Sequence, residues 1–443
     1  MNIQLSDHFD TKKLLRFTLP SIAMMIFTSI YGVVDGFFVS NYVGKIPFAA
    51  VNLIMPFLMI LGTVGFIFGT GGSAIVAKTM GEGDKEKANR FFSLFIYFSS
   101  AVAAIIAVLG IIFIEPVSVL LGAEGEMINN CVKYGRIILC ALPFFVLQLE
   151  FQSFFITAEK PNLGFISTIV SGVTNMLMDW LLVGVFAFGL EGAAFATAIS
   201  QTVGGIIPLV YFARKNESLL RLGKTSLDGR AIGKACVNGS SEFMSNISMS
   251  LVGMLYNAQL LKYAGENGVA AYGVMMYVNF IFASAFIGYS IGVAPVVGFH
   301  DGAGNHEELK GLLRRSVRII AVFSLCMTVA AQFLAIPFAQ LFVGYDSELM
   351  NLTVTGFRIC AFSYLFMGFA IFSSGFFTAL NDGVTSAIIS FLRTLVFQCA
   401  SVILLPLIWD INGVWVSIVV AEFMAVSLSA IFLVIKRKKY HYI

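Results

Sequence analysis

The sequence carries little charge. Only 12% of its 443 residues are Asp, Glu, Lys or Arg, whereas soluble globular proteins average about 25%. Hydrophobic residues make up 58% of the chain, and its mean hydropathy is +0.88. A single soluble core cannot bury so much apolar surface, so the composition excludes a soluble globular protein and predicts one whose solvent is lipid. The net charge of +3 requires no nucleic-acid partner.

The sequence also lacks the motifs of metal, redox and nucleotide sites. Its six cysteines are scattered without a C-x-x-C pair, and its four histidines lie near the termini and in one polar loop, so no metal-ligand cluster is visible. The segment G-T-G-G-S at 69–73 lacks the lysine of a phosphate-binding loop. We therefore expect no enzyme activity, no cofactor, and any pumping to draw on an ion gradient.

Long apolar runs fill the chain instead. A helix needs roughly 20 apolar residues to cross a bilayer, and twelve stretches meet this length. The predicted spans are 14–40, 46–78, 91–113, 130–157, 162–188, 191–212, 235–262, 268–299, 315–337, 352–379, 384–408 and 412–436. The sequence thus predicts an all-α integral membrane protein.

Basic residues predict the orientation of these spans. If the N-terminus is cytoplasmic, 23 of the 28 Lys and Arg residues fall on the inside, Arg393 among them, and 5 fall on the outside. Loops rich in Lys and Arg stay in the cytoplasm. We therefore predict a multi-pass protein of the cell membrane with both termini in the cytoplasm.

The chain repeats itself at a shift of about 221 residues. Gly44 aligns with Gly265, and the loop G-E-G-D-K-E from Gly81 aligns with G-A-G-N-H-E from Gly302. Six helices are an even number, so the two halves are parallel repeats around a central cavity. The expected domains are an N-lobe of helices 1–6 (1–213), a cytoplasmic linker (214–234) and a C-lobe of helices 7–12 (235–443).

Carboxylates inside the predicted spans are the main functional candidates. Asn175 and Asp179 lie one turn apart on one face of helix 5, and Asp35 lies at similar depth in helix 1. A charged residue at this depth is costly unless it is paired, protonated or hydrated. Two such acids favour a shared proton or a bound cation, and the repeat replaces both acids with uncharged residues in the second half. The alternative is that each acid makes a structural hydrogen bond between helices.

Further residues extend the predicted sites. Thr197 and Gln152 offer oxygen atoms to the same cation, and the residue types do not distinguish H⁺ from Na⁺. Pro20 opens helix 1 and favours a bend there, which would act as a gate. In the second half, Glu242 and Glu422 are candidates to attract a cationic substrate. The first half adds two further candidates, the acid Glu150 and Met176 as an adaptable apolar contact with substrate.

With these features the chain resembles the multidrug and toxic compound extrusion (MATE) family. It looks nearer to the DinF- and MepA-like branches of that family than to the NorM-like branch. The resemblance rests on the two six-helix halves, the glycine-rich loop and its copy, the P-x(14)-D pattern of Pro20 and Asp35, N-x-x-x-D in helix 5, and the turn after helix 4. It implies efflux of organic cations and other xenobiotics, driven by H⁺ or Na⁺. It also places five residues on the family's N-lobe cation site: Asp35, Gln152, Asn175, Asp179 and Thr197. Pro20 falls where helix 1 bends, and Glu242 matches an acid of helix 7.

The sequence therefore predicts a secondary antiporter that exports amphipathic or cationic small molecules, and that works as a monomer in the bilayer. The alternative is a lipid-linked oligosaccharide flippase of the same superfamily. Its cavity would need strong positive charge to hold a pyrophosphate, whereas the charges inside these spans are mostly acidic.

Overall fold

A computed structural model describes residues 3–344 and 346–442, and these form helices joined by loops, among them a 15-residue segment at 214–228. Eleven of the helices in this part of the chain are long and apolar enough to cross a membrane. One of them, α8 (Gly229–Gly302), reverses at Gly265, which has the left-handed backbone angle φ 60°. It therefore supplies two crossings, and the predicted set of twelve spans is confirmed.

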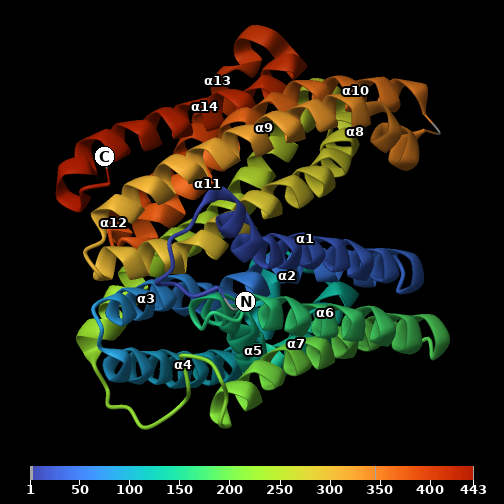
Figure 1. Ribbon diagram of the computed structural model, residues 1–443. Helices are drawn as coiled ribbons and strands as arrows, with labels where there is room; N and C mark the ends of the chain where they lie inside the picture. Colours follow the sequence, from blue (N-terminus) through green and yellow to red (C-terminus); the bar gives the residue numbers. More distant parts are fainter. Residues whose placement is uncertain (1–2, 345, 443) are drawn as a thin grey trace.

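The helices form two lobes, which lie one above the other in Figure 1. In three crossings the α-helix is interrupted by a π-helical segment (η1, η2 and η4). The N-lobe holds α1 (Thr11–Tyr42), α2 (Lys45–Phe66), η1 (Ile67–Gly72), α3 (Ser73–Gly81), α4 (Lys85–Leu120), α5 (Glu126–Thr157), α6 (Pro161–Met178), η2 (Asp179–Val185) and α7 (Gly189–Ala213). The C-lobe holds α8, α9 (His306–Val343), α10 (Ser347–Cys360), the 3-10 turn η3 (Ala361–Ser363), α11 (Tyr364–Ala379), α12 (Gly383–Phe391), η4 (Leu392–Phe397), α13 (Gln398–Leu404) and α14 (Pro406–Tyr440). Helix α8 begins six residues before the predicted span, inside the expected linker.

The backbone repeats with the same shift as the sequence. Left-handed residues recur 221 positions apart, at Gly44 and Gly265 and at Gly83 and Gly304. The N-caps behave alike, because Asp84 accepts from the amide of Lys87 and its counterpart Asn305 accepts from the amide of Glu308. The two lobes are therefore structural repeats of each other.

Both ends of the chain lie on one side of the molecule, which we call the terminal face; the opposite side is the far face. Near the terminal face, His8 Nδ1 lies 2.6 Å from Glu308 Oε2, and the rings of His306 and His441 are 5.0 Å apart. In Figure 1 the lobes lie together near α3 and α12 and diverge toward α10.

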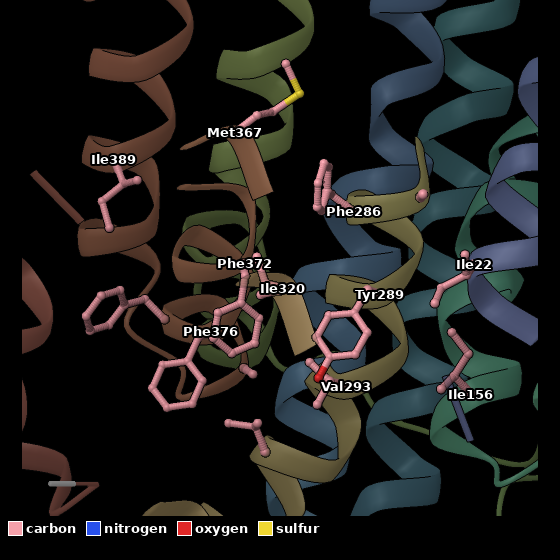
Figure 2. Close-up of a cluster of buried hydrophobic side chains, with 14 of the residues drawn as sticks. Ile22, Ile156, Phe286, Tyr289, Val293, Ile320, Met367, Phe372, Phe376 and Ile389 are labelled. Carbon is pink, nitrogen blue, oxygen red and sulfur yellow. The ribbon is translucent and has the colours of Figure 1, made fainter. Parts of the chain in front are cut away.

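The lobes touch along the terminal-face halves of their helices. A side chain added to Gly288 of α8 would place its Cβ 2.6 Å from Ile22 Cα of α1, and Gly239 of α8 packs equally closely on the backbone of Ile67 in η1. Glycine permits this close approach of backbones. The apolar core follows the same pattern. Figure 2 shows Ile22 facing Tyr289 within one cluster that takes in both lobes.

The far half of the N-lobe has a core of its own. A separate cluster of buried side chains there includes Val39, Ile54, Leu139 and Val183, and it takes in no described residue of the C-lobe. The two lobes therefore share apolar packing near the terminal face only. This arrangement joins them at that face and leaves them independent at the other.

Candidate functional site

The candidate site lies in the far half of the N-lobe, where α1, α6 and α7 meet. The carboxyl oxygen Oδ1 of Asp35 accepts hydrogen bonds from Thr197 Oγ1 at 3.2 Å and from Asn175 Nδ2 at 3.5 Å. The carboxyl group of Asp179, one turn after Asn175, lies close to that of Asp35. The structure thus brings together four of the five residues that the sequence singled out for cation coupling.

The local chain geometry explains the placement of these side chains. Asn175 and Asp179 are one turn apart, and η2 begins at Asp179, so the helix widens where the acid points inward. Helix α6 packs against both α1 and α7, which supply Asp35 and Thr197. Insertions of π-helix are often found at functional sites because they redirect side chains.

The site is buried, and only some of its polar atoms have hydrogen-bond partners. Asn175 and Asp179 are buried, and Asp35 and Thr197 are half-buried. Within the described structure, Asn175 Oδ1 and both carboxyl oxygens of Asp179 lack a hydrogen-bond donor. Buried oxygen atoms without donors are rare in proteins because they are costly. They are the atoms that a proton or a Na⁺ ion would satisfy, so the donor set fits either ion.

Gln152 does not belong to this group, and here the expected contact is wrong. Helix α5 runs from the far face to the terminal face, and Gln152 lies five residues before its terminal-face end. Asp35 lies seven residues before the far-face end of α1. The two residues are therefore at opposite depths, and Gln152 Nε2 is buried without an acceptor among the described residues.

Sequence reasoning missed Tyr134, which α5 supplies to the site. Its side chain is 1% exposed, and its hydroxyl donates to Met55 Sδ at 3.8 Å and lies close to Thr197 and Asp35. The only signal in the sequence was a tyrosine in the outer part of an apolar span. Tyr31 lies one turn before Asp35 on α1, beside Gln148, whose Nε2 donates to Ser171 Oγ at 3.2 Å.

Pro20 lies inside α1, which forms one continuous helix from Thr11 to Tyr42. The neighbouring residues Ser21 and Ile22 are those that approach α8 of the C-lobe. The predicted gate thus lies at the contact between the lobes. Its movement stays a prediction.

The other predicted acids have different surroundings. Glu150 is buried in α5 and accepts a 2.5 Å hydrogen bond from Ser99 of α4. Glu422 is 4% exposed and is paired with Arg393, whose Nε lies 2.9 Å from its Oε2. Glu242 is half-buried on α8. Met176 is half-buried on α6, and its role in substrate binding stays a prediction.

The prediction that Arg393 belongs to the basic residues on the cytoplasmic side is wrong. The structure places Arg393 ten residues into the crossing formed by α12, η4 and α13. It is therefore a charge at membrane depth, held by its ion pair with Glu422. In the described ranges, no three His, Cys, Asp or Glu side chains come together as a metal-binding group.

In the part of the chain that the structure describes, twelve membrane-length crossings in two repeated lobes, with a pair of carboxyl groups inside the N-lobe, define a membrane transporter. A family model described as MatE matches the chain twice, at residues 20–181 and 243–403, once in each lobe. The chain therefore belongs to the MatE family, the multidrug and toxic compound extrusion transporters.

Individual relatives agree over nearly the whole length. The multidrug export protein MepA of Staphylococcus haemolyticus is 27% identical over 413 residues, which cover 93% of this chain and 90% of that protein. The crystal structure of MATE in complex with MaL6 superposes with a TM-score of 0.93 and 22% identity over 98% of both chains. The outward-facing conformation of a multidrug resistance MATE family transporter of the MOP superfamily also gives 0.93 and 22%, over 100% of this chain and 99% of the other. These structural likenesses establish the fold.

Proposed function

We propose that this chain exports organic cations and other amphipathic small molecules across the cell membrane in exchange for H⁺ or Na⁺. Membership of the MatE family supports the transport role. The name of its relative MepA, a multidrug export protein, supports the substrate class. Both lobes come from one chain, so a monomer is the proposed working unit.

The observation that carries the coupling proposal is the pair of carboxyl groups of Asp35 and Asp179. Two carboxylates close together in a low-dielectric site repel each other unless a proton or cation lies between them. Entry of that ion removes the repulsion and lets α1, α6 and α7 pack more closely. Its exit reverses the change. The ion thereby biases the N-lobe between two arrangements, which is what coupling requires.

The contact between the lobes supports alternating access. The lobes pack together at the terminal face and have separate cores at the far face. We place the terminal face in the cytoplasm, as the distribution of Lys and Arg predicts. In that orientation the described state is closed to the cytoplasm, and release of substrate is toward the outside.

Flux measurements in proteoliposomes test the proposal. The efflux of a fluorescent organic cation is followed under a pH gradient and, separately, under a Na⁺ gradient, for the wild type and for Asp179→Asn. We expect one gradient to drive efflux in the wild type and neither to drive it in the variant. Asp346→Asn, the same change at the N-cap of α10 in the C-lobe, is the control.

Two results would overturn parts of the proposal. Gradient-driven efflux that survives in Asp179→Asn would remove the coupling role from this carboxyl pair. Absence of efflux for every cation in the wild type would overturn the drug-export function itself.

A further inference from the structure

The C-lobe contains a second charged group at mid-membrane depth, formed by Glu242 on α8, Arg393 on η4 and Glu422 on α14. The segment η4 packs against both α8 and α14. Arg393 Nε lies 2.9 and 3.2 Å from the two carboxyl oxygens of Glu422. The crossing that holds Arg393 runs beside the stretch of α8 that holds Glu242, because Gly383 packs on the backbone of Val237 and the hydroxyl of Tyr256 donates to Gln398 Oε1 at 2.7 Å. This group is far along the chain from the carboxyl pair of the N-lobe and belongs to the opposite lobe.

Glu242 lies on the side of α8 that faces the N-lobe. Gly239, three residues earlier and on the same face of the helix, packs against Ile67 of η1. Glu242 is therefore one turn beyond this contact, toward the far face, where the lobes no longer share a core. Its half-buried side chain therefore lies where the contact between the lobes ends.

Arg393 retains unused hydrogen-bond donors. Its Nε is committed to Glu422, but neither terminal nitrogen, Nη1 or Nη2, has an acceptor among the described residues. The Arg393 side chain is 16% exposed, compared with 4% for Glu422. Two free N–H₂ groups on a planar guanidinium form a fork that matches a carboxylate. Glu422 fixes the guanidinium and balances its charge.

We propose that Arg393 and Glu242 form a C-lobe subsite for substrates that carry both a delocalised or ammonium cation and a carboxylate. The cation of such a zwitterion lies against Glu242, and its carboxylate accepts hydrogen bonds from Nη1 and Nη2 of Arg393. A simple cation uses Glu242 alone. Arg393 is thus a specificity-determining residue, and this inference rests on the proposed function.

Equilibrium binding of two matched dyes tests the subsite. Rhodamine B carries a cation and a free carboxylate, and its ethyl ester carries the cation alone. Fluorescence anisotropy with the purified full-length chain in detergent gives a Kd for each dye. The test variant is the double substitution Arg393→Gln and Glu422→Gln, because removing Arg393 alone would leave Glu422 buried and unpaired.

In the wild type we expect the free acid to bind at least as tightly as the ester. In the double variant we expect the ratio of the Kd of the acid to that of the ester to rise about tenfold or more, since a charge-assisted pair of hydrogen bonds is lost. The double substitution Lys133→Gln and Glu191→Gln, which removes an exposed ion pair of the N-lobe, is the charge-matched control and should leave the ratio as it is. Glu242→Gln should weaken both dyes together.

An unchanged ratio in the double variant would overturn the subsite and leave Arg393 as the counter-ion of Glu422 only. This readout is independent of transport. If both dyes bind with the expected ratio but neither is exported from proteoliposomes, the export function fails while the subsite stands.

Discussion

Lys78 Nζ lies 2.8 Å from Asp301 Oδ2, and this ion pair joins α3 of the N-lobe to α8 of the C-lobe at the terminal face. Asp301 is 8% exposed, so loss of its charge leaves Lys78 without a partner in a half-buried place. We expect Asp301→Asn to weaken closure of this face by ~1 kcal/mol. The distances between spin labels at the exposed positions Glu86 and Glu307, in a cysteine-free background, test this. Their distribution should contain a larger share of long distances in Asp301→Asn than in the wild type. Asp346→Asn, outside this interface, should not change the distribution.

Gly288 tests the close packing of the lobes. A Cβ here would lie 2.6 Å from Ile22 Cα and 2.7 Å from the carbonyl oxygen of Ser21. Backbone atoms cannot move aside as a flexible side chain does, so Gly288→Val should hold the lobes apart and stop transport. Gly253→Val is the matched control, since nothing lies within 4 Å of its Cβ position. Equal transport by both variants would contradict the packing argument.

Thr197 tests the hydrogen bond to Asp35. Removal of its hydroxyl in Thr197→Val should cost ~1 kcal/mol and lower gradient-driven efflux about fivefold. Thr197→Ser keeps the hydroxyl and should retain most of the rate. The measurement is the initial rate of cation efflux from proteoliposomes at saturating substrate. A valine variant as fast as the wild type would show that the hydroxyl group does not matter.

The surroundings of Asp382 predict that the stability of the folded protein depends on pH. Burial raises the pKa of its carboxyl group, but hydrogen bonds from Lys436, Thr385 and Tyr440 outweigh burial and leave the pKa below its ordinary value of 3.8. A lowered pKa stabilises the fold above pH 3.8, and that contribution is lost as the pH falls through the lowered value.

We therefore expect Asp382→Asn to lower the melting temperature in detergent at neutral pH, and the difference from wild type to shrink in strong acid. Asparagine keeps the N-cap of α12, so the change isolates the ion pairs with Lys436 and Lys439, whose Nζ atoms lie 3.1 and 3.8 Å from Oδ2. Asp346→Asn, at an N-cap that has no ion pair among the described residues, should have a smaller effect. A difference that persists unchanged at low pH would contradict the assignment.

Glu308 fixes the N-terminal segment. Its carboxyl group accepts from the amide of Phe9 at 3.0 Å, pairs with His8, and pairs with Arg315 at 2.8 Å. Glu308→Ala should release residues 3–9 and speed tryptic cleavage after Lys12 and Lys13 about tenfold, because cleavage follows the population of the open segment. The exposed neighbour Glu307→Ala is the control, and equal cleavage of both variants would show that other contacts hold the segment.

Much of the architecture could be predicted from the sequence because lipid imposes simple rules. Helices in lipid must be long and apolar, so the twelve crossings follow from hydropathy. The glycine landmarks of the repeat mark left-handed turns, and Gly265 is indeed where α8 reverses. Asp35, Asn175 and Asp179 were recognisable because a polar side chain is conspicuous in an apolar span.

The site's full composition depended on how helices rotate and cross. Gln152 is on the right helix but at the wrong depth, and Tyr134 on the same helix takes a place near Thr197. Arg393 looked like a loop residue by charge counting, although its partner Glu422 holds it inside a crossing. A pairing between helices far apart in sequence leaves no local pattern.

The sequence by itself determined that this is a two-lobe membrane transporter with acids in the N-lobe, since burial in lipid makes each departure from apolar composition visible. Only the tertiary structure decided which face joins the lobes and which charges meet. Contacts such as Lys78 with Asp301 and Arg393 with Glu422 depend on the packing of distant helices, and that packing is set by the shapes of whole surfaces rather than by any single stretch of chain.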